Sequence, residues 1–524
     1  MKREQLIAPQ KYNLISEFER HAQVEGKLAL QWENEAGDKK EITYHDLMIN
    51  ANRIGNVFKA SGLTKGDVVL VVIPRLIEAY QVYIAALKLG LVVIPSSEML
   101  RTKDLQYRIT HGDVKAVVSY YPYVDQFVEI QAMEKLLKFT IGNQQQGWIC
   151  LDDELMGASS TLELTDTDRE DMAFLSYTSG TTGNPKGVVH THGWAYAHLH
   201  TAAEHWLGIE NGDKVWATAA PGWQKWIWSP FLSVLGMGAT GFVFNGRFEP
   251  KKYLSLMGEY DINVLCCTPT EYRLMAKVEN IADYQLPALK SAVSAGEPLN
   301  REVIDIFRKY FNIDVRDGYG QTENTLLVGV TKGTELREGA MGKPTPGNRV
   351  EIIDDYGNPC PVGVVGDIAV HIDTPALFKT YYKDPERTAK QYRGDYYVTG
   401  DRAKKDKEGY FWFEGRSDDI IISSGYTIGP FEVEDALVKH PAVKECAVVA
   451  SPDEVRGNVV KAFVVLRNED DQQKPGLIKE LQEHVKTLTA PYKYPRKIEF
   501  IDELPKTTSG KIRRIELRQK ELEV

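Results

Sequence analysis

The stretch VVLVVIPRLIEAYQVYIAALKLGLVVI, residues 68–94, decides the fold class of this chain. Residues 68–73 form a continuous apolar, largely β-branched run, which is typical of a strand buried on both faces. Residues 78–89 follow with helical spacing, and residues 91–94 are apolar again. This strand–helix–strand order predicts a parallel sheet covered by helices. Similar alternation at 263–267, 290–294 and 301–310 extends the prediction to a large α/β domain.

The pattern changes after about residue 415. Short alternating segments occur at 446–450, 459–466 and 497–501, and a helical pattern covers 477–488. Pro430 is well placed to open a further helix that runs to Lys439. We therefore expect a small α+β domain at the C-terminal end.

The amino-acid composition argues against several classes of function. The chain has 524 residues, 43% of them hydrophobic and 26% charged, which suits a globular protein of more than one domain. Its formal net charge of -10 argues against a general nucleic-acid binder. The five cysteines are odd in number and form no CxxC pair, which argues against a zinc ribbon or redox dithiol and fits a reducing compartment.

Location and assembly are less constrained. The first residues, MKREQLIAPQKYNLISEF, lack the apolar core of a signal peptide, and the longest apolar runs fall short of a membrane span. We expect a cytoplasmic protein with no membrane span. The sequence is compatible with a homo-oligomer and with a monomer.

The strongest chemical signal is YTSGTTGNPKG at 177–187, directly after the apolar stretch 172–175. Its glycines allow close backbone approach to a ligand, its hydroxyls can donate, and its lysine adds a mobile positive charge. These residues are Gly180, Gly183 and Gly187, then Thr178, Ser179, Thr181 and Thr182, and finally Lys186. The stretch predicts a cradle for phosphate oxygens; the alternative is a flexible surface linker. It is not a Walker A loop, because GxxxxGK[ST] occurs nowhere in the sequence.

Four more motifs follow: SAGEP (294–298), DGYGQTE (317–323), YVTGDRAKKDKEGYFWFEGRSDDII (397–421) and LPKTTSGKIRR (504–514). Together the five motifs, in this order, resemble those of the adenylate-forming superfamily, and the likeness covers nearly the whole chain. That superfamily includes acyl-CoA synthetases, luciferases and peptide-synthetase adenylation domains. The resemblance implies ATP-dependent conversion of a carboxylic acid to an acyl-adenylate, followed by transfer of the acyl group to a thiol.

The resemblance also implies a nucleotide site. Glu323 would hold the Mg²⁺ that bridges the ATP phosphates, and Thr322 would donate to the α-phosphate. Tyr319 would stack on adenine, and Asp401, supported by Arg416, would accept the ribose hydroxyls; the alternative for Asp401 is a turn residue after Gly400. The implied nucleotide-binding residues are Thr178, Ser179, Gly180, Thr181, Thr182, Gly183, Lys186, Gly296, Glu297, Pro298, Asp317, Gly318, Tyr319, Gly320, Gln321, Asp401 and Arg416.

A mobile C-terminal domain is implied as well. Lys511 would contact the carboxylate and α-phosphate during adenylation, and Asp418 would be the hinge between domains 1–417 and 418–524; otherwise Lys511 is a solvated surface charge. After rotation, Ser424, Gly425 and Tyr426 would face the site, and Arg456 and Lys486 would meet coenzyme A phosphates. The last two can also be plain exposed charges. Thr427 stands where many relatives carry arginine, which puts the thiol contacts in doubt.

The acid is suggested by residues that resemble the acyl pocket of medium-chain acyl-CoA synthetases. Acetyl-CoA synthetases typically close this pocket with a tryptophan at the position of Gly320, so glycine implies a longer or wider pocket. Trp206, Trp223, Lys225 and Cys267 resemble other pocket positions, although both tryptophans can also be core residues. We expect a medium-chain or branched short-chain acid, and aromatic acids also fit.

The resulting hypothesis is an AMP-forming acyl-CoA synthetase that uses ATP, Mg²⁺ and coenzyme A. The alternatives are an adenylation enzyme that loads a carrier protein, a luciferase-like oxidase and a catalytically silent ATP-binding regulatory module. Two other patterns are decoys. GMGATG at 236–241 matches GxGxxG but precedes a strand pattern, so we predict a helix-to-strand turn. His190, His192, His198 and His200 lack a metal-ligand pattern, so we predict capping and packing roles.

Overall fold

The computed structural model describes residues 1–178, 185–296, 299, 301–417, 419–423, 426–453, 456–489, 492–506 and 511–522. The chain divides into two compact units. The first contains Met1–Arg349 and Ile372–Gln391, and the second contains Val350–His371 and Tyr392–Val524. A movable boundary after residue 417 stays a prediction, and its hinge residue, Asp418, lies outside the described residues.

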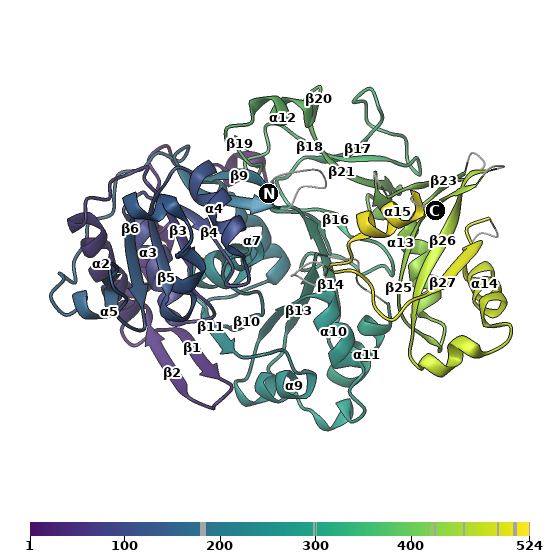
Figure 1. Cartoon of the computed structure of the whole chain (residues 1–524), viewed down its shortest axis with the longest axis horizontal. Coiled ribbons are helices and arrows are strands. Elements are labelled where there is room, and N and C mark those ends of the chain that lie inside the picture. Colours follow the sequence, from purple (N-terminus) through teal and green to yellow (C-terminus); the bar gives the residue numbers. More distant parts are fainter. Residues whose placement is uncertain are drawn as a thin grey trace. The chain divides into compact units, whose positions relative to one another are not determined.

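The stretch quoted above lies in an eight-stranded sheet of the first unit (Figure 1). Pairing is parallel from β8 to β7 and antiparallel at β8–β9 and β9–β19. In spatial order its described strands are β19 (Thr380–Tyr381), β9 (Lys186–Thr191), β8 (Met172–Thr178), β4 (Val92–Pro95), β3 (Val68–Val72), β5 (Val114–Tyr120), β6 (Leu137–Ile141) and β7 (Ile149–Cys150).

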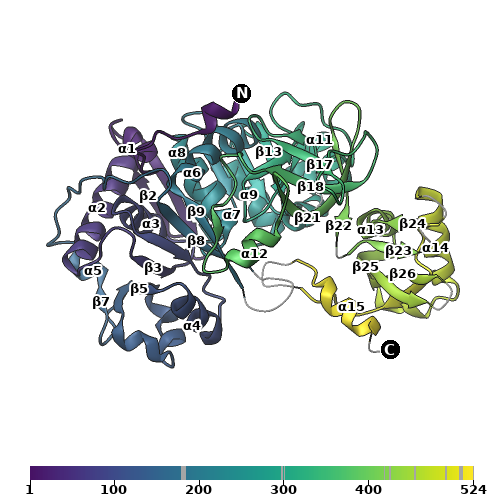
Figure 2. The ribbon, with the colours of Figure 1, turned by 90° about the horizontal axis from the view of Figure 1, so that it is seen from above.

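Both faces of this sheet are buried, as the apolar run predicts. Val69 and Val71 pack into a core with α2 (Tyr44–Ala60) and α3 (Ile77–Lys88). Val68 and Leu70 pack on the opposite face with α4 (Thr102–His111). Figure 2 shows α2 and α3 on one side of β3 and β5 and α4 on the other. Alternate residues of β3 thus serve two cores, because successive side chains of a strand point to opposite faces.

The first unit also contains a nine-stranded sheet. Its centre, from β14 to β1, is parallel, and antiparallel strands lie at both edges. The described strands, in spatial order, are β16 (Lys343–Pro344), β15 (Leu326–Gly329), β14 (Val315–Gly320), β13 (Ser291–Ala295), β12 (Val264–Cys267), β10 (Lys214–Ala217), β11 (Thr240–Asn245), β1 (Leu28–Asn34) and β2 (Lys39–Thr43).

Helices of two kinds pack on this sheet. Regular α-helices pack with one apolar core: α9 (Pro250–Glu259), α10 (Pro269–Ala276) and α11 (Arg301–Phe311). The other core takes side chains from α8 (Val234–Gly236) and the π-helical segment η4 (Leu199–Leu207), and a second π-helical segment, η5 (Ile227–Ser233), contacts β10. Beside these segments lie α6 (His192–His198) and α7 (Gln224–Trp226), whose buried residues join the core around α2 and α3. Because π-helical turns are rare and often lie at functional sites, η4 and η5 indicate a functional region on this side of the sheet.

The remaining helices of the first unit are short. They are α1 (Ser16–Ala22), α5 (Leu151–Glu154), α12 (Pro385–Lys390) and the 3₁₀ turns η1 (Arg3–Leu6), η2 (Tyr121–Phe127), η3 (Gln131–Lys135) and η6 (Ile281–Asp283). The decoy glycine motif joins α8 to β11, which confirms the predicted helix-to-strand turn.

The second unit is a smaller α+β assembly. Its strands form three sheets: β17 (Val350–Ile353), β18 (Gly366–His371), β21 (Tyr396–Lys405), β20 (Tyr392–Arg393) and β22 (Phe411–Arg416); β23 (Ile421–Ser423) and β24 (Tyr426–Ile428); and β25 (Val443–Asp453), β26 (Gly457–Leu466) and β27 (Lys497–Phe500). Its helices are α13 (Pro430–Val438), α14 (Leu477–Leu488), α15 (Arg514–Leu522) and the 3₁₀ turn η7 (Glu469–Gln473).

The sequence patterns after residue 415 correspond to this second unit. The predicted strands appear within β25, β26 and β27, the helical pattern is α14, and Pro430 stands in the first turn of α13. A partly buried ion pair ties the last helix to this core: Arg514 Nη2 lies 2.7 Å from Glu434 Oε2. The predicted fold class, a large α/β domain followed by a small α+β domain, is confirmed.

Candidate active site

Three predicted site regions meet at one edge of the nine-stranded sheet. Strands β12, β13 and β14 are parallel neighbours, so their carboxyl ends lie at the same edge. Cys267 ends β12, Gly296 follows β13, and Gly320 ends β14. Gly296 has φ of +111°, a backbone conformation that favours glycine. Parallel strand ends of this kind are a common place for ligand binding in α/β proteins.

The predicted phosphate loop joins two antiparallel strands of the other sheet. Thr178 ends β8 and pairs directly with Lys186, which begins β9. Thr178 Oγ1 is buried and has no hydrogen-bond partner among the residues that the structure describes. The predicted site residues that lie outside the described residues are Ser179, Gly180, Thr181, Thr182, Gly183, Glu297, Pro298, Asp418, Ser424 and Gly425.

Lys186, Glu323 and Tyr381 form a compact charged cluster that links the two sheets. Lys186 Nζ lies 3.2 Å from Glu323 Oε1, and the Tyr381 hydroxyl donates to the same oxygen at 2.8 Å. Lys186 Nζ also lies 3.2 Å from the Tyr381 hydroxyl oxygen. Glu323 and Tyr381 are both buried. The carboxylate is therefore held in place by a cation and a phenol before any ligand binds.

The cluster fits a magnesium ion that also binds ATP phosphates. The hydrogen bonds to the Glu323 carboxylate use Oε1, and within the described part of the chain Oε2 accepts none. The same residues contain no group of three or more His, Cys, Asp or Glu side chains able to hold a metal alone. Mg²⁺ commonly takes one or two carboxylates and completes its shell with water and substrate phosphates. A single carboxylate with one oxygen unbonded within the described residues, as at Glu323, is consistent with this kind of magnesium site.

The backbone around Glu323 is held by aromatic residues of β9 and α6. His190 Nε2 lies 2.6 Å from the Thr322 carbonyl oxygen, and Trp194 Nε1 donates to the Asn324 carbonyl at 3.2 Å. Because a carbonyl only accepts, His190 carries its proton on Nε2. The His190 and Trp194 rings lie 4.1 Å apart. The backbone that carries Thr322 and Glu323 is therefore held in place by side chains of β9 and α6.

His198 connects this loop to η5. Its Nε2 lies 2.8 Å from the Trp228 carbonyl oxygen, so Nε2 donates, and its Nδ1 accepts from the Thr325 hydroxyl at 2.7 Å. Burial lowers the pKa of His198 and of His190 to about 3 each. Both rings are thus neutral at neutral pH. The predicted packing role of these histidines is confirmed, with the added result that they position the loop.

Asp317 is a buried carboxyl on β14. Burial raises its pKa to about 7, although backbone N–H donors from Gly318 and Leu299 lower it in part. The next residues are Gly318, Tyr319 and Gly320, and Gln321 follows the strand. A Cβ on Gly318 would lie 2.6 Å from the Trp206 ring, so glycine lets that indole lie flat against the strand.

The predicted acyl-pocket residues gather beside this strand. Trp206 lies on η4 and donates from Nε1 to the Asp317 carbonyl at 3.2 Å. Lys225, on α7, places Nζ 4.5 Å from the Trp206 ring centroid. Trp223 precedes α7 and is partly buried, while Cys267 is fully buried and has a raised pKa because of that burial. The structure therefore brings Trp206 and Lys225 into contact and places Cys267 two strands away from β14.

The space beside Gly320 is already occupied. A Cβ there would lie 2.2 Å from the Thr325 carbonyl oxygen and 3.0 Å from Cη2 of Trp228. Glycine at this position is thus required by the close approach of its own neighbours. The ring of Trp228 therefore lies where a side chain at position 320 would begin.

Comparison with known proteins identifies the family. The model of the AMP-binding enzyme family matches residues 18–382, and the model of the AMP-binding enzyme C-terminal domain matches residues 432–511. The chain belongs to the AMP-binding enzyme family.

Individual relatives agree. This AMP-binding enzyme is 63% identical over 521 residues to the uncharacterized acyl-CoA ligase YtcI of Bacillus subtilis, covering 99% of this chain and 98% of the relative. It is 42% identical over 507 residues to the mouse mitochondrial acyl-coenzyme A synthetase ACSM3, covering 94% of this chain and 86% of the relative. The crystal structure of the anthranilate CoA ligase AuaEII in complex with anthranoyl-AMP matches with a TM-score of 0.91 at 28% identity, over 100% of this chain and 99% of that one. The predicted enzyme class, an AMP-forming acyl-CoA synthetase, is confirmed; the acid and the roles of single residues stay predictions.

The remaining predicted residues of this AMP-binding enzyme lie in the second unit. Asp401 on β21 and Arg416 on β22 are direct cross-strand neighbours, and their roles at the ribose stay predictions. Arg456 is exposed in the turn between β25 and β26, where its backbone N–H donates to Asp453. Lys486 on α14 pairs with Glu483 at 2.6 Å, and its Nζ lies 4.2 Å from the Tyr494 ring centroid. Tyr426 begins β24, and Lys511 is exposed just before α15.

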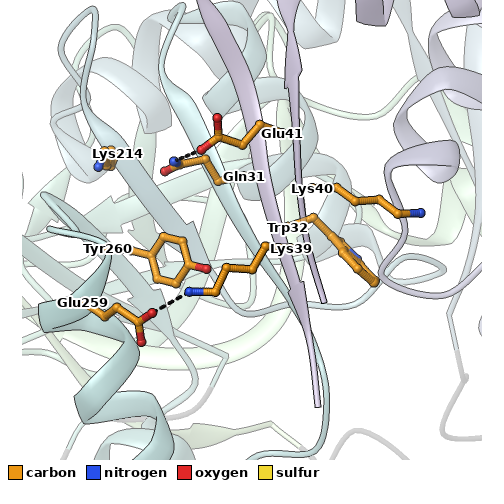
Figure 3. Close-up of a pocket in the computed structure, with 8 residues that line it drawn as sticks. All are labelled: Gln31, Trp32, Lys39, Lys40, Glu41, Lys214, Glu259 and Tyr260. Carbon is orange, nitrogen blue, oxygen red and sulfur yellow. Dashed lines mark hydrogen bonds and ion pairs between the residues drawn. The ribbon is translucent and has the colours of Figure 1, made fainter. Parts of the chain in front are cut away.

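A shallow pocket of about 280 Å³ lies elsewhere, along the edge strand β2 (Figure 3). Lys39 pairs with Glu259 at 2.6 Å, and Gln31 donates to Glu41 at 2.6 Å. Lys40 lies over the Trp32 ring at 5.3 Å. None of the predicted site residues lines this pocket.

Sequence reasoning missed several residues that shape the site. Tyr381 lies outside every recognised motif, so no local signal marks it. For His190 and His198 the sequence analysis predicted packing but not their bonds to the loop around Glu323, and helical spacing could not have joined them, because His190 lies on β9 and His198 ends α6. Trp228 falls four residues after Gln224 in the stretch WQKWIW (223–228), and this helical spacing could have indicated that both side chains lie on one face.

No helix among the described residues is long and apolar enough to cross a membrane.

Proposed function

We propose that this enzyme joins a medium-chain or branched short-chain carboxylic acid to coenzyme A through an acyl-adenylate, with release of AMP and pyrophosphate. The observation that carries the adenylation step is the cluster of Lys186, Glu323 and Tyr381, which presents a fixed cation and a fixed carboxylate beside the phosphate loop. The relatives named above support the thiol step, because they are acyl-CoA ligases by name.

The first half-reaction joins two anions. A carboxylate oxygen of the acid attacks the α-phosphorus of ATP, the new O–P bond forms, and the bond to the pyrophosphate oxygen breaks. Lys186 and Lys511 would neutralise the developing charge, and Thr322 would donate to an α-phosphate oxygen. Mg²⁺, held by Glu323, would supply charge neutralisation across the phosphates. Asp317 and Tyr319 would meet adenine, and Asp401 the ribose.

The second half-reaction transfers the acyl group. The sulfur of coenzyme A attacks the acyl carbonyl carbon, and the bond to the AMP oxygen breaks. We expect the domain that begins at Asp418 to rotate between the two steps, replacing Lys511 by the Ser424–Tyr426 segment. Arg456 and Lys486 would meet the coenzyme A phosphates. Because Lys486 is already paired with Glu483, that contact requires exchange of partners.

The acid is argued from the resemblance of Trp206, Lys225 and Cys267 to acyl-pocket positions of medium-chain acyl-CoA synthetases. Lys225 Nζ lies near both the Trp206 and the Trp228 ring, which places these three side chains together beside β14. An aromatic acid also fits, since the structurally similar anthranilate ligase holds anthranoyl-AMP. A cytoplasmic location accompanies this proposal.

A panel of acids tests the function. Purified protein with Mg²⁺ and ATP is given fatty, branched and aromatic acids, and AMP release is measured with and without coenzyme A. Labelled pyrophosphate exchange into ATP reports adenylation alone. We expect exchange with several acids and coenzyme A-dependent thioester formation. Complete absence of exchange would overturn the proposal, and acetate as the best substrate would overturn the pocket argument.

Loading of a carrier protein is the second candidate. It predicts exchange of pyrophosphate without a thioester on free coenzyme A, and it predicts transfer to a pantetheinylated carrier instead. The same panel separates the two.

A further inference from the structure

One turn of chain beside β14 carries three buried nitrogen donors that lack acceptors. The atoms are Gln224 Nε2, Lys225 Nζ and Trp228 Nε1, and none has a hydrogen-bond partner within the residues that the structure describes. Gln224 is oriented by its other amide atom, since Oε1 accepts from the Ser176 hydroxyl at 2.5 Å. Buried donors are normally satisfied, so a cluster of this kind needs a cause.

Lys225 is the strongest member of the cluster. Its Nζ lies 4.5 Å from the Trp206 ring centroid and 5.7 Å from that of Trp228, so two indole faces attract the ammonium. The described residues contain no carboxylate that pairs with Lys225, although they contain many other ion pairs. Aromatic faces offer no oxygen lone pair to its N–H groups, and a buried ammonium without one is unfavourable.

The two tryptophans around Lys225 are restricted by contacts of their own. Trp206 is anchored by its bond to the Asp317 carbonyl and by its contact with Gly318. The Trp228 carbonyl accepts from His198 Nε2 and from the Ser233 hydroxyl at 2.6 Å, and its ring abuts Gly320. The donors are therefore preorganised beside the strand that carries the predicted nucleotide residues.

Resting on the proposed function, we propose that the acid activated here carries a second hydrogen-bond acceptor oxygen, which Lys225 Nζ and Trp228 Nε1 bind. The group is a second carboxylate, a ketone or a hydroxyl on a short or branched acyl chain. A carboxylate suits the site best, because it brings charge to the ammonium and accepts from both donors. A methyl group in the same place would leave both donors buried and unpaired.

Matched pairs of acids test this inference. Succinate is compared with 4-methylpentanoate, glutarate with 5-methylhexanoate, and 4-hydroxybenzoate with 4-methylbenzoate, so that each pair has nearly the same shape. The measured quantity is the ratio of kcat/KM within a pair, from pyrophosphate exchange. The wild type is expected to prefer the oxygen-bearing member of at least one pair by about tenfold or more, because a site built for hydrogen bonding discriminates strongly against an apolar analogue.

Variants then assign the preference to its donors. Lys225→Met is expected to lower that ratio by about tenfold or more, and Trp228→Phe to lower it by a smaller factor. Lys40→Met is the matched control, because Lys40 also lies over an indole ring but at the edge pocket of Figure 3; its ratio should equal that of the wild type. Thermal unfolding checks that each variant is folded, and Trp228→Phe carries the test if Lys225→Met does not fold.

Two results would overturn the inference. One is preference for the apolar member in every pair by the wild type. The other is an equal loss on both members of a pair in Lys225→Met, which would assign the lysine to the reacting carboxylate or to stability. Exchange with apolar acids alone would sink this inference and leave the proposed function standing, whereas no exchange with any acid would sink the proposed function.

Discussion

His190 is expected to make the protein less stable as the pH falls below about 6.5. Its ring is buried, its Nε2 donates to the Thr322 carbonyl at 2.6 Å, and burial lowers its pKa from 6.5 to about 3. The unfolded chain binds a proton at this ring near pH 6.5, but the folded protein does so only near pH 3. Protonation therefore favours the unfolded state throughout the interval between these values.

The magnitude follows from the size of the interval. Each pH unit below 6.5 costs about 1.4 kcal/mol of unfolding free energy for one such histidine, so the cost at pH 5 is about 2 kcal/mol. His192, with a pKa lowered to about 4, and His198 act in the same direction. Asp317 acts in the opposite direction, because its pKa is raised to about 7. The total pH dependence of the wild type thus mixes several groups, and a difference between variants is needed.

His190→Gln isolates the effect. The glutamine amide can still donate to the Thr322 carbonyl but does not titrate. Urea unfolding followed by tryptophan fluorescence gives the free energies at pH 7.5 and pH 5. We expect the stability advantage of the wild type over His190→Gln to shrink by about 2 kcal/mol at the lower pH. His45→Gln, at an exposed position, is the control and should show no such change.

Parallel loss of stability in the wild type and His190→Gln would refute the reasoning. A second measurement is independent of unfolding. Nitrogen-15 spectra of the histidine rings at pH 5 should show neutral rings protonated on Nε2, and one of these signals should be missing in His190→Gln.

Three further predictions concern the cluster of Lys186, Glu323 and Tyr381, the buried carboxyl of Asp317 on β14, and Lys511 of the C-terminal domain. Tyr381→Phe removes the 2.8 Å hydrogen bond to the Glu323 carboxylate, and a hydrogen bond to a charged group contributes about 1.5–3 kcal/mol. We therefore expect the rate of pyrophosphate exchange to fall by about 10- to 100-fold and the Mg²⁺ concentration needed for half-maximal rate to rise. Tyr382→Phe, which loses only a hydrogen bond to Asp113, is the control and should change neither quantity. Asp317→Asn should gain stability relative to the wild type as the pH rises from 3.8 to 7, by about 4 kcal/mol in total, because the folded carboxyl keeps a proton that the unfolded chain releases. The same stability difference between variant and wild type at pH 4 and at pH 8 would contradict this. Lys511→Ala should abolish adenylation yet still convert supplied acyl-adenylate to thioester, and an equal loss of both steps would count against rotation of the C-terminal domain.

The sequence by itself determined the fold class and the chemistry. The run at residues 68–73 predicts a strand buried on both faces, and β3 serves two cores, because strand periodicity is written in neighbouring residues. The glycines, hydroxyls and lysine at 177–187 predict a phosphate cradle, and the resemblance of the five motifs to those of adenylate-forming enzymes implies adenylate chemistry, with Glu323 as the expected metal ligand. Such information survives in a short stretch of chain, whatever the rest of the molecule does.

Only the tertiary structure decided which side chains complete the site. Glu323 meets Tyr381 across 58 residues of chain and Lys186 across 137. Strand order places β19 beside β9, and the packing of the two sheets brings β9 to the loop after β14. Lys225 lies between Trp206 and Trp228 only because η4 and η5 pack together. Contacts between distant segments depend on how the sheets and helices pack, and no single stretch of sequence carries that information.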